Sequence, residues 1–280
     1  MGNQGYVVRR YLPEDRDAIV DLFNRVFGEK DPEFRAHDLA WWRWKYEGNP
    51  AGSHILVAEN AEGRVIGHYG GVPMNVRSEG ATYVFGQNCD AYIDSSERRG
   101  LKNPGMFARL GQAYASTFAT RGGDAVMYGM ANREHYRLGA RYLDYWMART
   151  QWSLVLRDPS RLPDWDWATH AVPTKTFGPA ADAFAAAEEK NYPCVGVRDA
   201  AFLNWRFGGH PGGRYVTAYA KSGDRDDYRG HAAFAVGRFD QSDRALLVDW
   251  FVDPDDEGAA RSLLRWASER AAQAGRESLT

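Results

Sequence analysis

The sequence predicts an α/β protein of the α+β type, in which a mixed, mostly antiparallel central sheet is flanked by helices, and it predicts this arrangement twice. Three observations support the prediction. Strand-like and helix-like segments alternate in a specific order, a basic glycine-containing loop joins a strand to a helix near residue 100, and an aromatic helix motif recurs in the second half. With 280 residues, 44% of them hydrophobic, the chain can bury large cores in two units of ordinary size.

The first half opens with a strand and two helices. Residues 6–11 are predicted as a strand, and Pro13 starts a helix whose apolar residues recur with helical spacing until Gly28. A second, aromatic-rich helix follows Asp38 and ends at residues 48–50.

Further strands and helices follow in alternation. Residues 61–63 form a turn between the first two of these strands, and an aromatic and apolar periodicity begins the long helix at Met106. The expected strands cover residues 55–59, 65–76, 83–93, 125–130 and a final region at 141–156, and a short helix covers 132–138.

The loop after residues 83–93 has the character of an anion site. Gly100 and Gly105 let the backbone turn its N–H groups toward one point, and the free N–H groups of the following helix add to them. Such a loop suits a phosphate or pyrophosphate, although a tight structural connection has the same pattern. Its basic residues are Arg98, Arg99 and Lys102.

The overall charge gives no long-range attraction to nucleic acid or to an anionic membrane, because 35 basic and 37 acidic residues leave a net charge of −2. Cys89 and Cys194 cannot form a disulfide framework, and no Cys/His group has zinc spacing. The N-terminus lacks an apolar signal core and no apolar run is long enough to span a membrane. We expect a cytoplasmic protein with no metal, membrane or nucleic-acid partner; the oligomeric state stays open.

Over about the first 150 residues the sequence resembles the GNAT acetyltransferase superfamily, whose members bind acyl-CoA. The resemblance rests on the order of elements, the opening residues 8–15, the loop from Arg99 to Gly105 and the segment 132–139. It implies that the fourth strand splays from the fifth to leave a cleft for the pantetheine arm, while the loop and the next helix hold the pyrophosphate. The implied cofactor-binding residues are Tyr92, Ile93, Arg98, Arg99, Gly100, Leu101, Lys102, Gly105, Met106 and Asn132.

The loop is longer than the family pattern, because residues 101–104 separate Gly100 from Gly105. Pro104 also removes one backbone donor. Since basic residues flank the insertion, we expect the loop to bulge and still present its N–H groups to a phosphate.

Acyl transfer from a thioester to an amine needs a neutral amine, stabilisation of the oxyanion and an acid for the departing thiolate. The family holds the thioester carbonyl with a backbone N–H that falls near Tyr92 or Ile93. Asp90 is a candidate base and, under strand alternation, shares a face with Asn88 and Tyr92. Its other interpretation is a buried, hydrogen-bonded carboxylate, and His68 on the preceding strand is more typical of a structural histidine.

The acid is expected on the short helix after the fifth strand, by resemblance to the family. Tyr136 is the first candidate and His135, which occupies the family's usual spacing, is the second. Asn132 precedes this helix and is expected to cap it, while the resemblance also gives it contacts with the pantetheine amides.

A repeat extends the resemblance to the second half. The segment DLAWWRWKYEGNPAG at residues 38–52 matches DAAFLNWRFGGHPGG at residues 199–213 without a gap, although a coincidence of aromatic helices is the alternative. Both segments lead into strands, and the second half adds a helix at 258–274. Its expected strands are 215–220, 231–237 and 245–252.

The second copy is expected to be degenerate. Where the first has its basic loop, residues 253–258 form a run of carboxylates that would repel a pyrophosphate. Its next strand would begin only near residues 275–280, so the copy is either truncated or completed by another element. The predicted organisation is an acyl-CoA-binding domain at 1–157, a packed linker at 158–190 and an incomplete GNAT-like domain at 191–280.

These features together predict an acyl-CoA-dependent N-acyltransferase that uses acetyl-CoA as co-substrate, needs no metal, and acts by direct attack of a small-molecule amine. The alternative is a non-catalytic tandem protein that binds a ligand or serves as a scaffold. A transferase that uses aminoacyl-tRNA ranks last, because the composition offers no excess of basic residues.

Overall fold

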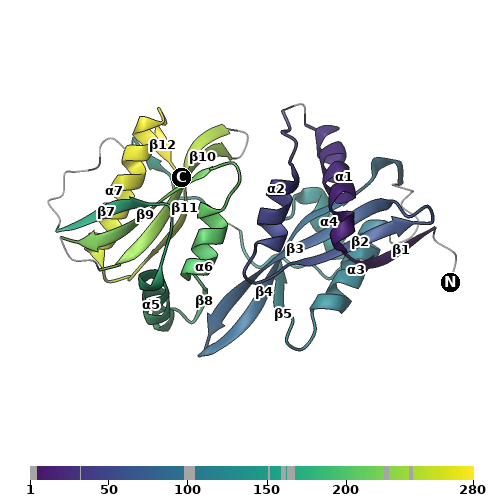
Figure 1. The fold of residues 1–280 in the computed structure, drawn as a ribbon, viewed down its shortest axis with the longest axis horizontal. Helices are drawn as coiled ribbons and strands as arrows, with labels where there is room; N and C mark the ends of the chain where they lie inside the picture. Colours follow the sequence, from purple (N-terminus) through teal and green to yellow (C-terminus); the bar gives the residue numbers. More distant parts are fainter. Residues whose placement is uncertain are drawn as a thin grey trace. The chain divides into compact units, whose positions relative to one another are not determined.

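The computed structural model describes residues 5–31, 33–97, 105–150, 152–158, 162, 168–223, 227–239 and 242–280. These residues form two compact units. The first contains the described residues up to Val76 and those from Gly80 to Arg149, and the second contains Arg77–Glu79 and the described residues from Thr150 to Thr280. Each unit has a mixed sheet flanked by helices, which confirms the predicted fold class (Figure 1).

The sheet of the first unit follows the order β1-β2-β3-β4-β5. Its pairs β1–β2 and β2–β3 are antiparallel, whereas β4 and β5 are parallel. The strands are β1 Tyr6–Arg10, β2 His54–Asn60, β3 Val65–Ser78, β4 Ala81–Ile93 and β5 Asp124–Tyr128, and the helices are α1 Arg16–Gly28, α2 Leu39–Trp42, α3 Met106–Phe118 and α4 Arg133–Tyr142.

Alternation along β2 divides the first core between the two faces of the sheet. Ile55 and Val57 pack with the buried residues of α1 and α2, whereas Leu56 and Ala58 pack with those of α3. Because both faces of the central strands are covered, the end of β4 is held between two helical layers.

The second unit shares much of this order of elements, with two additional short strands. Its sheet runs β6-β12-β11-β10-β9-β7, with antiparallel pairs except for the parallel pair β11–β12. The strands of this sheet are β6 Leu156–Arg157, β7 Thr169–Thr174, β9 Tyr215–Ser222, β10 Gly230–Phe239, β11 Ser242–Val252 and β12 Ser278–Leu279. The short strand β8 Cys194–Gly196 is not part of this sheet, and the helices are α5 Pro179–Glu188, α6 Ala200–Leu203 and α7 Glu257–Gln273.

The expected final strand region at 141–156 is wrong. Helix α4 continues to Tyr142, and none of the described residues from 143 to 155 belongs to a strand. Instead, β6 pairs with β12. A segment that comes before the other strands of the second unit therefore forms the edge of its sheet, next to the last strand. The stretch 158–190, expected as a packed linker, contains β7 and α5.

The matched segments at 38–52 and 199–213 have the same local structure. In each, an aspartate accepts a hydrogen bond from the N–H three residues on, at 2.9 Å for Asp38 and 2.8 Å for Asp199. A short α-helix then widens into a π-helical turn, Arg43–Glu47 or Asn204–Gly208, closed in each case by a glycine N–H at 2.7 Å.

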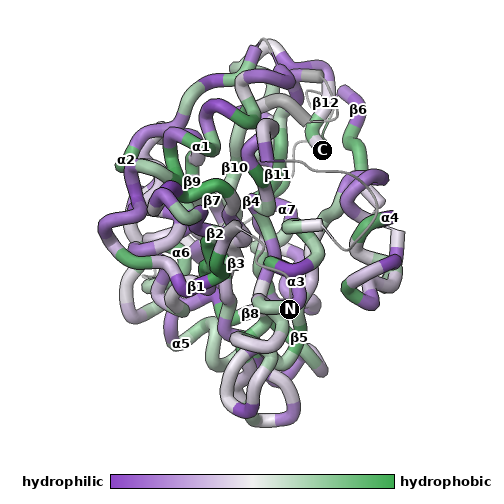
Figure 2. The backbone as a smooth tube through the Cα atoms, turned by 90° about the vertical axis from the view of Figure 1, so that its right-hand side faces the viewer, coloured by the Kyte–Doolittle hydropathy of each residue, from purple (hydrophilic) through white to green (hydrophobic). Residues whose placement is uncertain are grey.

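Helix α4 is mostly hydrophilic, with Leu138 and Ala140 as its apolar residues, and purple segments mark its tube in Figure 2. In the described part of the chain, no helix combines the length and the apolar character needed to cross a membrane.

Candidate functional site

The pairing of β4 with β5 ends in the region where the family resemblance implies a cleft. Their parallel pairing runs from Val84 opposite Asp124 to Gln87 opposite Tyr128, where β5 ends. The remainder of β4 continues to Ile93 beyond that last pair. At the point of separation, a Cβ on Gly129 would lie 3.1 Å from the backbone oxygen of Asn88, which explains the glycine.

Asp90 lies in this unpaired part of β4 and has an unusual backbone. Its φ of +50° falls in the left-handed region, which costs a non-glycine residue free energy and is sustained only by surrounding contacts. Lys45 Nζ lies 2.5 Å from its carboxylate, and the hydroxyl of Tyr46 donates to the same oxygen at 2.7 Å. The ring of His68 supplies a third restraint, because Nδ1 lies 2.7 Å from the Asp90 carbonyl oxygen.

Electrostatics keeps this cluster in one protonation state. Burial alone would raise the pKa of Asp90, but the Lys45 charge and the hydrogen bonds from Lys45 and Tyr46 bring it below its usual value. Burial lowers the pKa of His68 to about 4, so the ring is neutral near pH 7. Since a carbonyl oxygen only accepts, the His68 proton sits on Nδ1 and donates to Asp90.

Because Asp90 has a left-handed backbone conformation, the side chains of β4 do not alternate regularly between the two faces of the sheet. Tyr92 and Asp90 share a face, as predicted. This face is the side of α1 and α2, where Tyr92 donates to the backbone oxygen of Ile19 at 3.1 Å. Asn88, expected beside them, instead lies near the hydroxyl of Tyr69, a residue of the cluster that packs on α3, and among the described residues its buried Oδ1 has no hydrogen-bond partner. Strict alternation therefore fails for Asn88, because the β4 backbone is irregular at Asp90.

The residue that follows β4, Asp94, forms an ion pair with α1. Arg25 pairs with Asp94 at 2.5 Å, and Asp94 also accepts from the N–H of Ser96 at 3.0 Å. The predicted anion-binding residues come next, and five of them lie outside the described residues: Arg98, Arg99, Gly100, Leu101 and Lys102.

Gly105 and Met106 are described, and they form the start of α3. Gly105 is the N-cap and has no side chain to occupy the first turn, which contains no acidic residue. Met106 packs toward the sheet, because a Cβ on Gly67 would lie 3.1 Å from its Sδ. The first-turn N–H groups of α3 thus have no side-chain cap from Gly105.

In the second unit, the N-terminus of α7 is capped by the side-chain carboxylate of Asp256. Asp256 caps α7, with Oδ1 accepting from the N–H of Ala259 at 3.0 Å and Oδ2 paired with Arg229 at 2.7 Å. Glu257 adds a second negative charge in the first turn. A phosphate would have to displace Asp256 and approach Glu257, so α7 is a poor anion site.

The short helix α4 lies beside α3. Asn132 is the expected N-cap, and its side chain accepts from the N–H of His135 at 2.9 Å. The His135 ring stacks on Phe107 of α3, with centroids 5.4 Å apart and planes 19° apart. Tyr136 occupies the same first turn of α4 and is partly buried.

A cluster of tyrosines on the α3 face is an additional candidate for the acid. The hydroxyls of Tyr69 and Tyr145 lie 2.6 Å apart, and burial raises the pKa of Tyr69. The Tyr114 ring packs against the Tyr69 ring at a tilt, with centroids 4.9 Å apart, and among the described residues its buried hydroxyl has no hydrogen-bond partner. The sequence signal for Tyr145 is Gly139, because a Cβ there would lie 2.0 Å from the Tyr145 ring.

The structure therefore divides the predicted site residues between two faces. Asp90 and Tyr92 contact the α1–α2 side, whereas Ile93 and Met106 pack in the cluster on the α3 side, where the Phe107 ring meets His135. Within the described ranges, no group of three His, Cys, Asp or Glu side chains is arranged to hold a metal ion.

Solved structures share this fold. A conserved protein of unknown function from Enterococcus faecalis V583 superposes with a TM-score of 0.61 at 10% identity, covering 98% of this chain and 64% of that one. A GCN5-related N-acetyltransferase from Kribbella flavida gives 0.57 at 10% identity, covering 100% and 64%. A GCN5-related glucosamine N-acetyltransferase region of a fungal multi-domain β-N-acetylglucosaminidase gives 0.56 at 12% identity, covering 98% and 35%.

These comparisons establish the fold of GCN5-related N-acetyltransferases. The chain spans less than two thirds of the length of each of these structures. The sequence matches no protein-family model. No curated protein matches it either.

Proposed function

We propose that the chain is an N-acyltransferase that moves an acyl group from acyl-CoA, in particular acetyl-CoA, to a small-molecule amine. The observation that carries the proposal is the end of the β4–β5 pairing after Gln87, followed by α3, whose N-cap residue Gly105 supplies no side-chain cap. The fold shared with N-acetyltransferases supports it.

The first unit fits the donor at the start of α3. Arg98, Arg99 and Lys102 bring positive charge to a helix end whose cap, Gly105, leaves room for a phosphate. We assign pyrophosphate binding to these residues with Gly100, Leu101 and Met106, thioester contacts to the backbone near Tyr92 and Ile93, and pantetheine contacts to Asn132.

We propose that the second unit is a degenerate copy that does not bind CoA. The equal local structures after Asp38 and Asp199, and the similar order of strands and helices in both units, support a tandem origin. The Asp256 cap on α7 supports the loss of the phosphate site.

In the reaction, the chain's residues have to orient the donor and supply a proton to the departing thiolate. Tyr136 and His135 remain the candidate acids, and Tyr145 joins them because its hydroxyl belongs to a buried hydrogen-bonded pair beside α3. We assign Asp90 a positioning role, since Lys45 and Tyr46 already occupy its carboxylate. The glucosamine acceptor named for the fungal region makes amino sugars a first acceptor class to try.

Isothermal titration with acetyl-CoA tests the proposal. We expect saturable binding that weakens at least tenfold when Arg98 and Arg99 are both replaced by alanine, because each guanidinium neutralises phosphate charge. The matched control replaces Arg261 and Arg265, two arginines of α7, and should bind acetyl-CoA like the unmodified chain. Absence of saturable binding to the unmodified chain would favour the non-catalytic alternative.

A further inference from the structure

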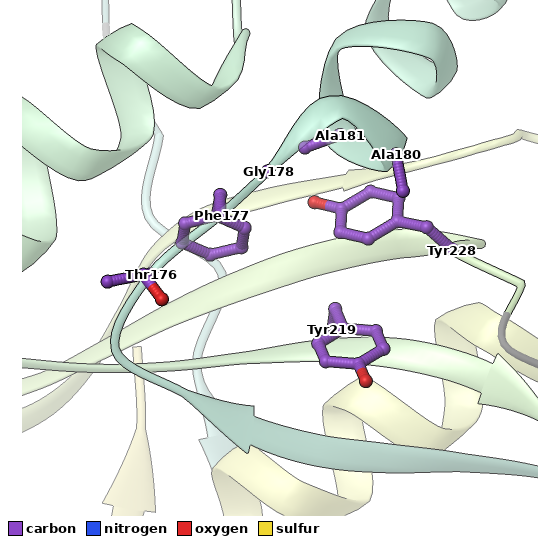
Figure 3. A pocket seen from close by; sticks show the side chains of 7 residues that line it. All are labelled: Thr176, Phe177, Gly178, Ala180, Ala181, Tyr219 and Tyr228. Atoms are coloured by element: carbon purple, nitrogen blue, oxygen red, sulfur yellow. The ribbon is translucent and has the colours of Figure 1, made fainter.

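The second unit contains a small cavity at the start of α5 that the proposed reaction does not use. Its volume is about 160 Å³, and its walls include the rings of Phe177, Tyr219 and Tyr228 (Figure 3). A cavity of comparable size in a protein core, about 150 Å³, binds benzene. The space therefore suits one six-membered ring.

The aromatic walls are held in place by the fold. Tyr219 and Tyr228 stack with centroids 5.6 Å apart and planes 13° apart, and Phe177 meets Tyr228 at 78°. The backbone of Phe177 is clamped by Asn204, which accepts from its N–H at 2.8 Å and donates to its carbonyl at 2.9 Å. Such fixed aromatic surfaces favour a flat ligand.

One polar group on the wall is connected to a buried hydrogen-bond chain. The Tyr228 hydroxyl lies 2.8 Å from Nδ1 of His231, and Nε2 of His231 lies 3.4 Å from Asp249. Arg198 pairs with the same carboxylate at 3.0 Å, and the His231 residue is only 1% exposed. In the close-up view, the Tyr228 hydroxyl points toward Phe177.

The charges fix the direction of this chain of hydrogen bonds. Burial would raise the pKa of Asp249, but His231 and Arg198 hold it below its usual value, so the group is a carboxylate. The Asp249 carboxylate therefore accepts a hydrogen bond from Nε2–H of His231, and in this neutral tautomer Nδ1 accepts from the Tyr228 hydroxyl. Because Tyr228 donates its only proton inward, its oxygen presents lone pairs to the cavity, and the donated bond strengthens it as an acceptor.

We propose that this cavity binds a flat, single-ring molecule carrying one hydrogen-bond donor, of the phenol class, with the ring against the aromatic walls and its donor on the Tyr228 oxygen. The site goes beyond the proposed acyl transfer and needs no acyl donor. The simpler role for Tyr228, His231 and Asp249 is structural, and the experiment distinguishes the two.

The test compares phenol, benzene and cyclohexanol as probes in NMR titrations of the full chain. We expect saturable phenol binding about three- to tenfold tighter than benzene, the ratio one neutral hydrogen bond gives. Cyclohexanol has the donor but no flat ring and should bind more weakly than phenol. Tyr228→Phe should leave benzene binding unchanged and abolish the preference for phenol, whereas Tyr192→Phe, a hydroxyl change in the same unit outside the cavity, should alter neither.

A second pair of variants tests whether the probes bind inside the cavity. Ala180 lines the cavity and is exposed, so Ala180→Leu should fill it and abolish binding of both aromatic probes. Ala183→Leu makes the same change on an exposed position of α5 away from the cavity wall and should bind normally. Equal affinities for phenol and benzene, a phenol preference that survives Tyr228→Phe, or no saturation by any probe would overturn the proposal.

Discussion

At the scale of single residues, the most informative position is Asp90. A carboxylate that faces a cleft could act as a base, but this one is already bonded to a lysine and a tyrosine, and its backbone is strained. The contacts are better suited to holding the end of β4 in one shape than to exchanging protons with a substrate. The sequence indicated both interpretations of Asp90 but could not choose, because Lys45 and Tyr46 are remote along the chain.

Asp90→Asn should destabilise the fold by about 3 kcal/mol at pH 7, since it leaves the largely buried Lys45 charge without its counter-ion. The folded pKa of Asp90 is lower than the unfolded one, so its contribution is present above about pH 4 and is lost as pH falls. The difference in urea-unfolding free energy between variant and wild type should therefore shrink toward pH 3. Asp21→Asn on the exposed face of α1 is the control, and a pH-independent difference would contradict the assignment.

His68 should stay neutral down to about pH 5, because burial brings its pKa to about 4. The unfolded histidine takes up a proton near pH 6.5, so folding stability should fall as pH drops from about 6.5 to 4. Long-range ¹H–¹⁵N correlation spectra of the ring nitrogens should show a proton on Nδ1 throughout pH 5–8. A proton on Nε2, or titration within that range, would be inconsistent with the hydrogen bond to Asp90.

The acid can be identified by replacing each candidate. If one hydroxyl protonates the departing thiolate, its phenylalanine variant should lose about 10²- to 10⁴-fold in kcat with little change in acetyl-CoA affinity. The variants to compare are Tyr136→Phe, Tyr145→Phe and His135→Gln. Their activity is measured as thiol release from acetyl-CoA in the presence of pooled amines. Equal activity of all three variants and the wild type would remove this group of candidates.

At the scale of elements, the two aspartate-capped helices with π-helical turns are the clearest local similarity between the two units. The sequence predicted a helix after Asp38 and a matching segment at residues 199–213, because an aromatic helical run bounded by glycine and proline recurs there. It did not predict the π-helical turns, because a single wide turn leaves no distinctive residue spacing.

Removing either cap should cost about 1 kcal/mol of unfolding free energy, because one first-turn N–H loses its partner. Asp38→Ala and Asp199→Ala belong to different units and share no hydrogen-bond partner, so their effects should add in the double variant. Denaturant unfolding followed by circular dichroism measures this. An effect below a few tenths of a kcal/mol at either site would argue against equivalent capping.

At the scale of the whole molecule, the order of strands and helices was sufficient to predict the fold class, because each element was bounded by proline, glycine or capping residues. The pairing of β6 with β12 at the edge of the second unit's sheet was not predictable from the sequence. Only two residues of β6 pair with β12, and so short a strand carries no periodic pattern. The site was predicted in part. Asn132 caps α4 as expected, whereas Tyr145 was identified only from the structure, in which its ring lies against Gly139.

The two units differ most where a cofactor phosphate would bind. The first presents a glycine cap at α3 after a basic loop, and the second closes α7 with Asp256. This contrast is electrostatic and local, which is why a chain with a net charge of −2 can still contain an anion site.

Amide hydrogen exchange with and without acetyl-CoA, combined with the binding stoichiometry, tests this contrast most directly. We predict one acetyl-CoA per chain, with slower exchange at the first turn of α3 and the end of β4 and no change at the first turn of α7. Two bound molecules, protection at α7, or no protection at α3 under saturating acetyl-CoA would contradict the assignment of the donor site to the first unit alone.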